Sequence, residues 1–178
     1  MKRYRILGFD FDSRATMLKT EIQDNWEPHI KKLWRKNKEE IEEGLVAQYG
    51  AYGFHDKVKN FIELGPAPWS VIAFHNKFLR QVRDSFVVGA YYPSLTGACA
   101  LGERILNQLI IHLRGYYTGT PEYKRVYRKD SFDNWDIAID TLESWGVLLN
   151  DVAAKFRDLK DTRNRAIHFN PETDENDR

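Results

Sequence analysis

The stretch SLTGACALGERILNQLIIHLR, residues 94–114, is the most apolar part of the chain and decides the expected fold. Its apolar residues recur at intervals of three and four, the periodicity of one face of an α-helix. The same spacing recurs over residues 69–90, in a shorter segment after Asn134, and over residues 147–168. Four amphipathic helices within about 100 residues are typical of a helical bundle. We therefore predict an all-α fold, with "YYPS" separating the first two bundle helices and Ser94 and Asn134 as N-caps.

The chain before residue 69 differs in character and is expected to form a mostly helical appendage. Ser13 can cap a helix that runs to about Asn25, and Pro28 suits the first turn of a charged helix ending near Tyr49. The Gly- and Pro-rich segment that follows is interpreted as a connection, and residues 3–11 as a short strand or an extended arm. The predicted divisions are an appendage (1–68), a bundle (69–169) and an acidic, disordered tail (170–178).

Composition excludes several classes of protein. The 178 residues carry a net charge of +1, so any nucleic-acid site must be a local patch. Cys99 is the single cysteine, so no intramolecular disulfide can form, and no apolar run reaches the roughly 18 residues of a membrane span. The histidines have no metal-ligand spacing with Cys99 or with each other. We expect a cytoplasmic protein with no cofactor, no metal and no membrane partner.

Two charged residues interrupt apolar stripes of the predicted bundle. One stripe steps through positions 99, 103, 106, 110 and 113, which places Glu103 on the core-facing line of its helix. The other steps through 152, 156, 159, 163 and 166, and places Arg163 in the same way. Because an unpaired buried charge is costly, we predict that Glu103 and Arg163 form an ion pair. Such a pair could serve only to set the helix register.

The end of the last helix brings further polar residues together. Asn164 and His168 are four residues apart, so they share one helix face and look toward an edge of the bundle. Histidine titrates near neutral pH and can act as a general acid or base. A histidine at a helix C-terminus can also be a simple cap, because the exposed carbonyls carry partial negative charge.

The sequence RNRAIH, residues 163–168, resembles the Arg-polar-x(3)-His motif of the HEPN superfamily, which lies near the end of the last helix of an all-helical bundle. Glu103 resembles the acidic residue that often contacts the motif arginine. The resemblance covers about residues 69–169 and implies a metal-independent endoribonuclease in which Arg163, Asn164 and His168 act in a homodimer. It also implies a role in antiphage defence or as a toxin, with an antitoxin or regulatory protein as a possible partner. Many family members are instead inactive modules that bind RNA, nucleotide or protein.

A second candidate region is RGYYTGTPEYKRVYRKD, residues 114–130, which interleaves tyrosines with basic residues. Stacking rings beside cationic groups suit single-stranded RNA. The alternative is a solvated loop whose tyrosines pack on the bundle. The candidate RNA-binding residues are Arg114, Tyr117, Lys124, Arg125, Tyr127, Arg128 and Lys129.

Overall fold

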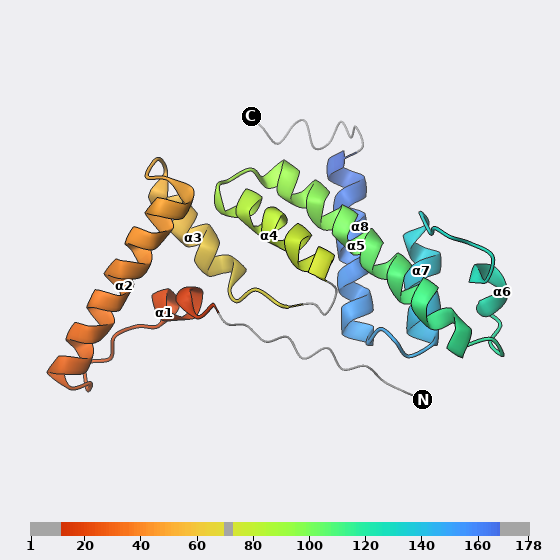
Figure 1. Ribbon diagram of the computed structural model, residues 1–178, viewed down its shortest axis with the longest axis horizontal. Coiled ribbons are helices and arrows are strands. Elements are labelled where there is room, and N and C mark those ends of the chain that lie inside the picture. The colour runs from red at the N-terminus through yellow and green to blue at the C-terminus, as the bar shows by residue number, and fades with distance from the viewer. Residues whose placement is uncertain (1–11, 70–72, 168–178) are drawn as a thin grey trace. The chain divides into compact units, whose positions relative to one another are not determined.

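The computed structural model describes residues 12–69 and 73–167, and every regular element in these ranges is a helix (Figure 1). The all-α prediction is therefore confirmed. The expected strand or arm at 3–11, the acidic tail and His168 lie outside the described residues. None of the described helices has the length and apolar character that crossing a membrane requires. The helices are α1 (Arg14–Lys19), α2 (Pro28–Tyr49), α3 (Phe54–Leu64), α4 (Ala73–Val87), α5 (Tyr91–Leu113), the 3-10 turn η1 (Arg114–Tyr116), α6 (Tyr123–Val126), α7 (Trp135–Ser144) and α8 (Asn150–Ile167).

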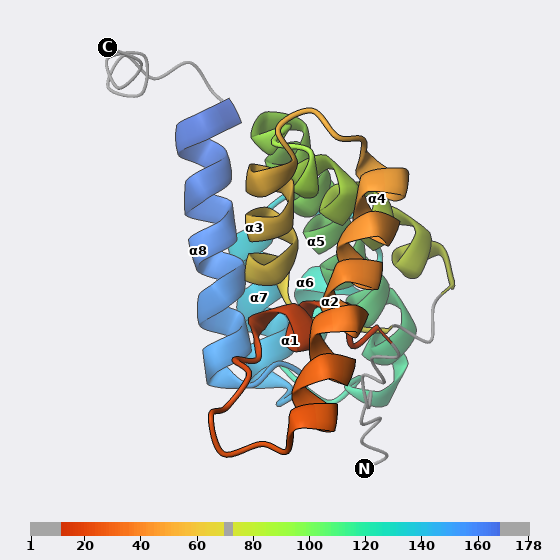
Figure 2. The same ribbon diagram turned by 90° about the vertical axis from the view of Figure 1, so that its left-hand side faces the viewer.

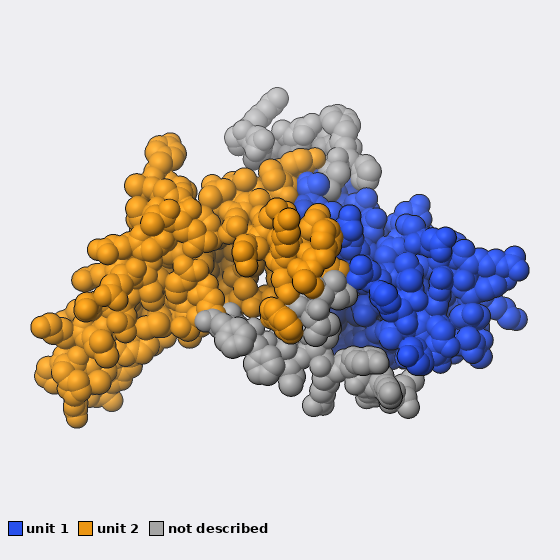
Figure 3. Space-filling model, in the orientation of Figure 1, with its two compact units in different colours: residues 1–3, 95–178 blue, residues 4–94 orange. Residues whose placement is uncertain are grey.

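The chain forms two compact units that divide between Ser94 and Leu95, within the first turns of α5. In chain order, we call the part before Leu95 the first unit (orange in Figure 3) and the part from Leu95 onward the second unit (blue in Figure 3). The boundary expected from the sequence lay earlier, after residue 68. The difference arises from α4, which packs on α3 inside the first unit. The four helices expected for the bundle are all present as α4, α5, α7 and α8, and three of them lie wholly or mainly in the second unit.

The first unit contains α1 to α4 around a small core. Its fully buried apolar residues are Ala15, Leu45, Phe61 and Val87, one from each of these helices. Pro28 begins α2 at the position where its missing N–H costs nothing. The helix ends at Tyr49, because Gly50 follows with a positive φ of 80°. Both ends of α2 were predicted from the sequence.

Three local predictions for this region were wrong, each for a physical reason. Helix α1 ends at Lys19 rather than near Asn25, because the Lys38 ammonium donates hydrogen bonds to the carbonyls of Leu18 (3.0 Å) and Thr20 (2.6 Å). The expected connection after Tyr49 contains α3, whose glycines lie at its two ends rather than inside it.

The third correction concerns the break before α5. It occurs at Gly89, which has a φ of 82°, and not at "YYPS". Pro93 falls in the first turn of α5, where a missing N–H is tolerated. Ser94 is therefore inside the helix instead of capping it, and its hydroxyl donates to the carbonyl of Val82 (3.0 Å).

The second unit has the larger core, in which α5, α7 and α8 contribute most side chains. Fully buried residues include Leu106 and Ile110 on α5, Ile139 and Leu142 on α7, and Ala153 on α8. The predicted cap at Asn134 is confirmed, since its side chain accepts a hydrogen bond from the Ile137 amide (3.2 Å). Figure 2 shows α8 running beside α7.

The outer surface of the α7–α8 pair carries ion pairs. Arg157 reaches Asp140 (2.8 Å) and Glu143 (2.7 Å), and Lys160 reaches Asp136 (2.6 Å). These contacts hold the two helices in register on their solvent side, although exposed pairs of this kind contribute only modestly to stability.

Candidate functional site

A surface groove of about 530 Å³ runs along the middle of α5, from Thr96 to Gln108, and includes Arg163 from the C-terminal turns of α8. Glu103 and Arg163, the two charged residues on the predicted stripes, both line it. Cys99, Asn107 and Ser131 contribute to its walls. The helical spacing predicted that Glu103 and Arg163 meet inside the bundle, whereas both line this groove at its surface.

Glu103 and Arg163 do not form the direct ion pair that the stripes predicted; among the described residues, no salt bridge joins them. Both side chains contact Trp135 instead. Its indole Nε1 donates to Glu103 Oε2 at 3.4 Å, and the Arg163 guanidinium lies 6.0 Å from its ring centroid. The prediction was wrong because both charged residues are only half-buried, so neither needs a direct partner to offset desolvation.

Trp135 is the structural support of the groove. Only 3% of the residue is exposed, and its ring meets Phe156 of α8 edge-on at 6.3 Å. A Cβ atom placed on Gly102 would lie 2.9 Å from Trp135 Cη2 and 3.3 Å from a Leu159 methyl group. Glycine at position 102 therefore lets α5 approach the indole and α8 closely. This contact fixes the ring that supports Arg163.

Cys99 lies in the wall of the groove but is only 3% exposed. Burial raises the pKa of its thiol, and the positive charge of Arg163 acts in the opposite direction without cancelling that effect. The thiol is therefore protonated near neutral pH, and a neutral thiol is a poor nucleophile. We assign Cys99 a packing role.

Asn107 fastens the segment before α7 to α5. Its Nδ2 donates to the carbonyl of Phe132 (2.9 Å), and its Oδ1 accepts from the amide of the same residue (2.6 Å). The Nδ2 group also donates to the Glu103 carbonyl (2.8 Å). This clamp holds Ser131 at the rim of the groove and Phe132 in the core.

Two of the candidate RNA-binding residues have structural contacts. The Arg114 guanidinium donates to the carbonyls of Val126 (2.9 Å) and Lys129 (2.5 Å), so it closes the C-terminal end of α6. The Tyr117 ring stacks on Trp145, with centroids 4.5 Å apart and an interplanar angle of 2°. Both side chains hold the chain around α6 in place, and both are only partly accessible to a ligand.

The other five candidates are exposed and lie on either side of the buried Val126. Tyr127 stacks on Tyr123 (5.5 Å between centroids), and the Arg128 guanidinium lies 5.0 Å from the Tyr127 ring. We call these five exposed residues the basic segment; they are Lys124, Arg125, Tyr127, Arg128 and Lys129.

The motif at the end of α8 is described only in part. Arg163 is half-buried in the groove, and Asn164 is exposed on the following position of the helix. The predicted general acid or base, His168, lies outside the described residues. Within the described ranges, no cluster of three histidine, cysteine or carboxylate side chains could hold a metal ion.

Sequence reasoning missed the residues that organise this site. Trp135 was not singled out as a site residue, although an indole can serve both a core and a polar neighbour through its N–H. Gly102, inside the most apolar helix, was the available signal for a close approach between elements. Asn107 gave no signal, because its partner is backbone 25 residues away.

Comparisons with known proteins leave the family open. No protein-family model matches the chain, and the searches of curated proteins and of solved structures also give no match.

Proposed function

We propose that this protein cleaves RNA without a metal ion, with Arg163, Asn164 and His168 as the reacting cluster and Glu103 as a supporting residue. The proposal rests on the motif resemblance in RNRAIH together with one observation about the site. Arg163 lines a groove of about 530 Å³ and lies over a buried indole that Glu103 also contacts. A guanidinium held in this way is prepared for an anionic ligand before the ligand arrives.

The position of the basic segment also supports an RNA ligand. Glu103 and Asn107 are one turn apart on α5, and Arg114 begins η1 directly after α5 ends; continued at helical spacing, the three positions fall within about 40° of one another. The groove is therefore on the same side of α5 as the residue that anchors the basic segment. At about 1.5 Å per residue, the distance along the helix from Glu103 to Arg114 is roughly 16 Å. One single strand could contact both regions, with phosphates at the cations and bases at the tyrosines.

The proposed reaction needs no group beyond the RNA and the side chains. A ribose 2′-oxygen attacks the adjacent phosphorus, and the bond from phosphorus to the 5′-oxygen breaks. His168 moves the protons, and the leaving 5′-oxygen receives one. Arg163 stabilises the charge that develops on the phosphoryl oxygens, and Asn164 orients the phosphate or the imidazole. The products are a 2′,3′-cyclic phosphate and a 5′-hydroxyl.

The same proposal includes a homodimer, since one chain supplies a single motif histidine and the resemblance implies a composite site across a two-fold axis. It also includes a cytoplasmic role in antiphage defence or as a toxin, restrained by an antitoxin or regulatory protein.

A cleavage assay on single-stranded RNA tests the proposal. His168→Ala should lose about 10²–10⁴-fold in rate, the usual contribution of general acid–base catalysis, while RNA binding is retained. Arg163→Gln is a usable second variant, because a half-buried arginine without a direct ion pair can be replaced without unfolding the protein. Arg157→Gln, on the outer face of the same helix, is the matched control and should keep full activity. Equal cleavage by wild type and His168→Ala, or loss of cleavage in EDTA, would contradict the mechanism.

The second candidate function is an RNA-binding module without catalysis, and the exposed basic segment favours it. Replacing Arg125 and Arg128 with Gln should weaken RNA binding and reduce its dependence on salt, because fewer counterions are released. If wild type binds RNA in this salt-dependent way and never cleaves it, the binding module is the better description.

A further inference from the structure

Helix α2 leaves most of its surface without a partner within its own unit. It has 22 residues, and Leu45 is the only one among them that is fully buried. Leu33, an apolar residue in its first half, is 51% exposed. In Figure 1 the first turns of α2 extend beyond α3. A single exposed apolar residue is ordinary on a protein surface, so Leu33 carries weight only together with the cavity and the charge pattern of the same helix.

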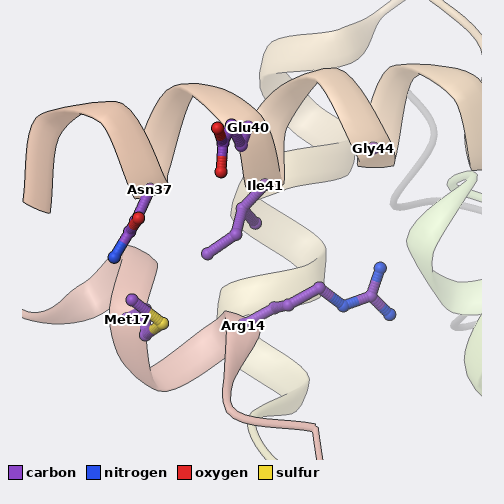
Figure 4. A pocket seen from close by; sticks show the side chains of 6 residues that line it. All are labelled: Arg14, Met17, Asn37, Glu40, Ile41 and Gly44. Atoms are coloured by element: carbon purple, nitrogen blue, oxygen red, sulfur yellow. The ribbon is translucent and has the colours of Figure 1, made fainter. Parts of the chain in front are cut away.

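A cavity of about 300 Å³ lies farther along the same helix, between α1 and α2. Figure 4 shows Ile41 pointing from α2 toward α1, with Met17 and Arg14 on either side of it. Gly44 forms part of the wall, and no atom lies within 4 Å of the position that a Cβ would occupy there. Asn37 and Glu40 also line the cavity, so its walls are mixed, with Ile41 and Met17 as the apolar part and open space above the glycine.

Arg14, the charged residue that α1 contributes to this cavity, already has hydrogen-bond partners. The Arg14 guanidinium donates to Asp12 (2.9 and 2.7 Å) and to Gln48 (3.2 Å). These contacts with Arg14 hold the pKa of the Asp12 carboxyl below its usual range. With its charged end occupied, Arg14 presents its aliphatic stem to the cavity, which suits an apolar ligand group.

The charges of α2 are segregated in an order that does not favour an isolated helix. Cations fill its first half and anions its second, opposite to the preference of the helix dipole. Lys36 pairs with Glu40 (3.4 Å) in the less favourable order for an i,i+4 pair. The cations are Lys31, Lys32, Arg35, Lys36 and Lys38, and the anions are Glu39, Glu40, Glu42 and Glu43.

A single two-fold axis would relate Leu33 to the cavity at Gly44, and the cationic half of α2 to the anionic half. The junction between cations and anions lies between Lys38 and Glu39. Leu33 and Gly44 are equally far from that junction on opposite sides, at roughly 8 Å along the helix for a rise of 1.5 Å per residue. A two-fold axis through the junction therefore places each Leu33 over the Gly44 cavity of a second copy. The same axis places each cationic half beside an anionic half.

We propose that α2 pairs antiparallel with α2 of a second copy of this chain, with Leu33 of each copy inserted in the Gly44 cavity of the other. A contact of one helix pair falls below the roughly 1,200 Å² of standard interfaces, so the dimer is weak and transient. Its opposed charges make it weaken as salt rises. The proposal does not depend on RNA cleavage.

Gly44→Gln is the sharpest test, since the new side chain occupies the space needed by Leu33 of the second copy. A Cβ at position 44 meets no atom within 4 Å, and Gln has a higher helix propensity than Gly, so the variant should unfold at the same or a higher denaturant concentration than wild type. Sedimentation equilibrium should show a concentration-dependent association of wild type that weakens as salt rises, and an at least roughly tenfold weaker association of Gly44→Gln, as for loss of an interface hot spot; the motif dimer of the proposed function should not respond to Gly44→Gln. A wild type without such salt-sensitive association up to several hundred micromolar, or a salt-sensitive association unchanged by Gly44→Gln, overturns the proposal.

Exchanging charges tests the antiparallel arrangement separately. One variant replaces Lys32, Arg35 and Lys36 with Glu, and the other replaces Glu39, Glu42 and Glu43 with Lys. Each variant alone should lose the association through α2, because both halves of its helix carry the same charge, while the separate homodimer proposed for the α8 motif is untouched by these substitutions. An equimolar mixture should form a heterodimer that dissociates at high salt. If both variants self-associate like wild type, or if the mixture forms no heterodimer while each variant retains its helix by circular dichroism, the charge arrangement has another cause.

Discussion

Helices α2 and α5 are nearly equal in length, at 22 and 23 residues, yet they are stabilised in different ways. Helix α5 buries Cys99, Leu101, Leu106 and Ile110, and packs against α7 and α8. Helix α2 buries one residue fully and carries dense charge along its surface. The comparison indicates that tertiary packing specifies α5. Helix α2 is specified instead by local signals at the two ends of α2 and by a few side-chain contacts.

The largest expected effect distinguishes the tryptophans of the two units. Trp135→Ala should reduce the free energy of unfolding by about 3–5 kcal/mol, because it removes a buried ring between α5 and α8. Trp34→Ala on α2 should cost about half of the 1.5–3 kcal/mol that full burial contributes, since that ring is half-buried beside Trp26. Urea unfolding followed by circular dichroism compares the two variants. An equal loss of unfolding free energy in the two variants would show that the core of the first unit is packed as tightly around its tryptophan as the core of the second.

Replacing glycine with alanine should change the stability of the protein in opposite directions at two positions. Gly102→Ala should destabilise by about 1–3 kcal/mol, because its methyl group would overlap Trp135 and crowd Leu159. Gly44→Ala should stabilise by about 0.5–1 kcal/mol, because it raises helix propensity where nothing obstructs the methyl group. Differential scanning calorimetry of both variants measures the contrast. Stabilisation by Gly102→Ala would mean that α5 does not approach Trp135 closely.

Two asparagine clamps offer a finer comparison. Asn107→Ala should destabilise by about 1–3 kcal/mol, because both backbone groups of Phe132 lose their side-chain partner beside a buried ring. Asn60→Ala should cost less, since Asn60 donates over 3.1 and 3.4 Å to the carbonyls of Phe86 and Val87. Hydrogen exchange at the Phe132 amide should accelerate in Asn107→Ala and stay unchanged in Asn60→Ala. Unchanged exchange in both variants would refute the Asn107 clamp.

These comparisons also show which features the sequence could predict. Periodicity and end signals predicted both ends of α2, the existence of α5, α7 and α8, and the N-cap at Asn134. They also brought Glu103 and Arg163 together, although as a buried ion pair rather than as two half-buried residues that line one groove. Features of this kind depend on residues close together in the chain, or on the angular position of a side chain around its own helix.

Features that depend on which elements meet could not be predicted in this way. The indole that contacts both Glu103 and Arg163 comes from a third helix, so two stripes alone suggested a direct ion pair. Arg114 was predicted to bind RNA because residues 114–130 mix tyrosines with basic residues. Its guanidinium instead donates hydrogen bonds to carbonyls 12 and 15 residues away. Helix α3 was missed for a different reason, because its flanking glycines were taken as loop rather than as helix ends.

The smallest expected effect concerns one of the few tertiary contacts of α2. The Tyr49 hydroxyl, at the end of α2, donates to Asp84 Oδ1 on α4 at 2.9 Å. Tyr49→Phe should therefore destabilise by about 0.5–1.5 kcal/mol at neutral pH, the usual net value of one hydrogen bond. Urea unfolding of both proteins measures this difference, and Tyr52→Phe is a matched control because Tyr52 is 94% exposed.

The pH dependence of that difference tests the contact more closely. Burial, together with the hydrogen bond to Asp84, raises the pKa of Tyr49 to about 12. In the unfolded chain its pKa is near the ordinary value of about 10. The folded state therefore favours the neutral phenol, and this stabilisation is complete below about pH 10 and declines as the pH approaches about 12. The advantage of wild type over Tyr49→Phe should accordingly be constant from neutral pH to about pH 9 and shrink above pH 10. Since lysines and other tyrosines titrate in both proteins, only the difference between the two reports on this contact. A difference that grows with pH would mean that the tyrosinate is the favoured form and that α2 is not tied to α4 through a neutral hydroxyl.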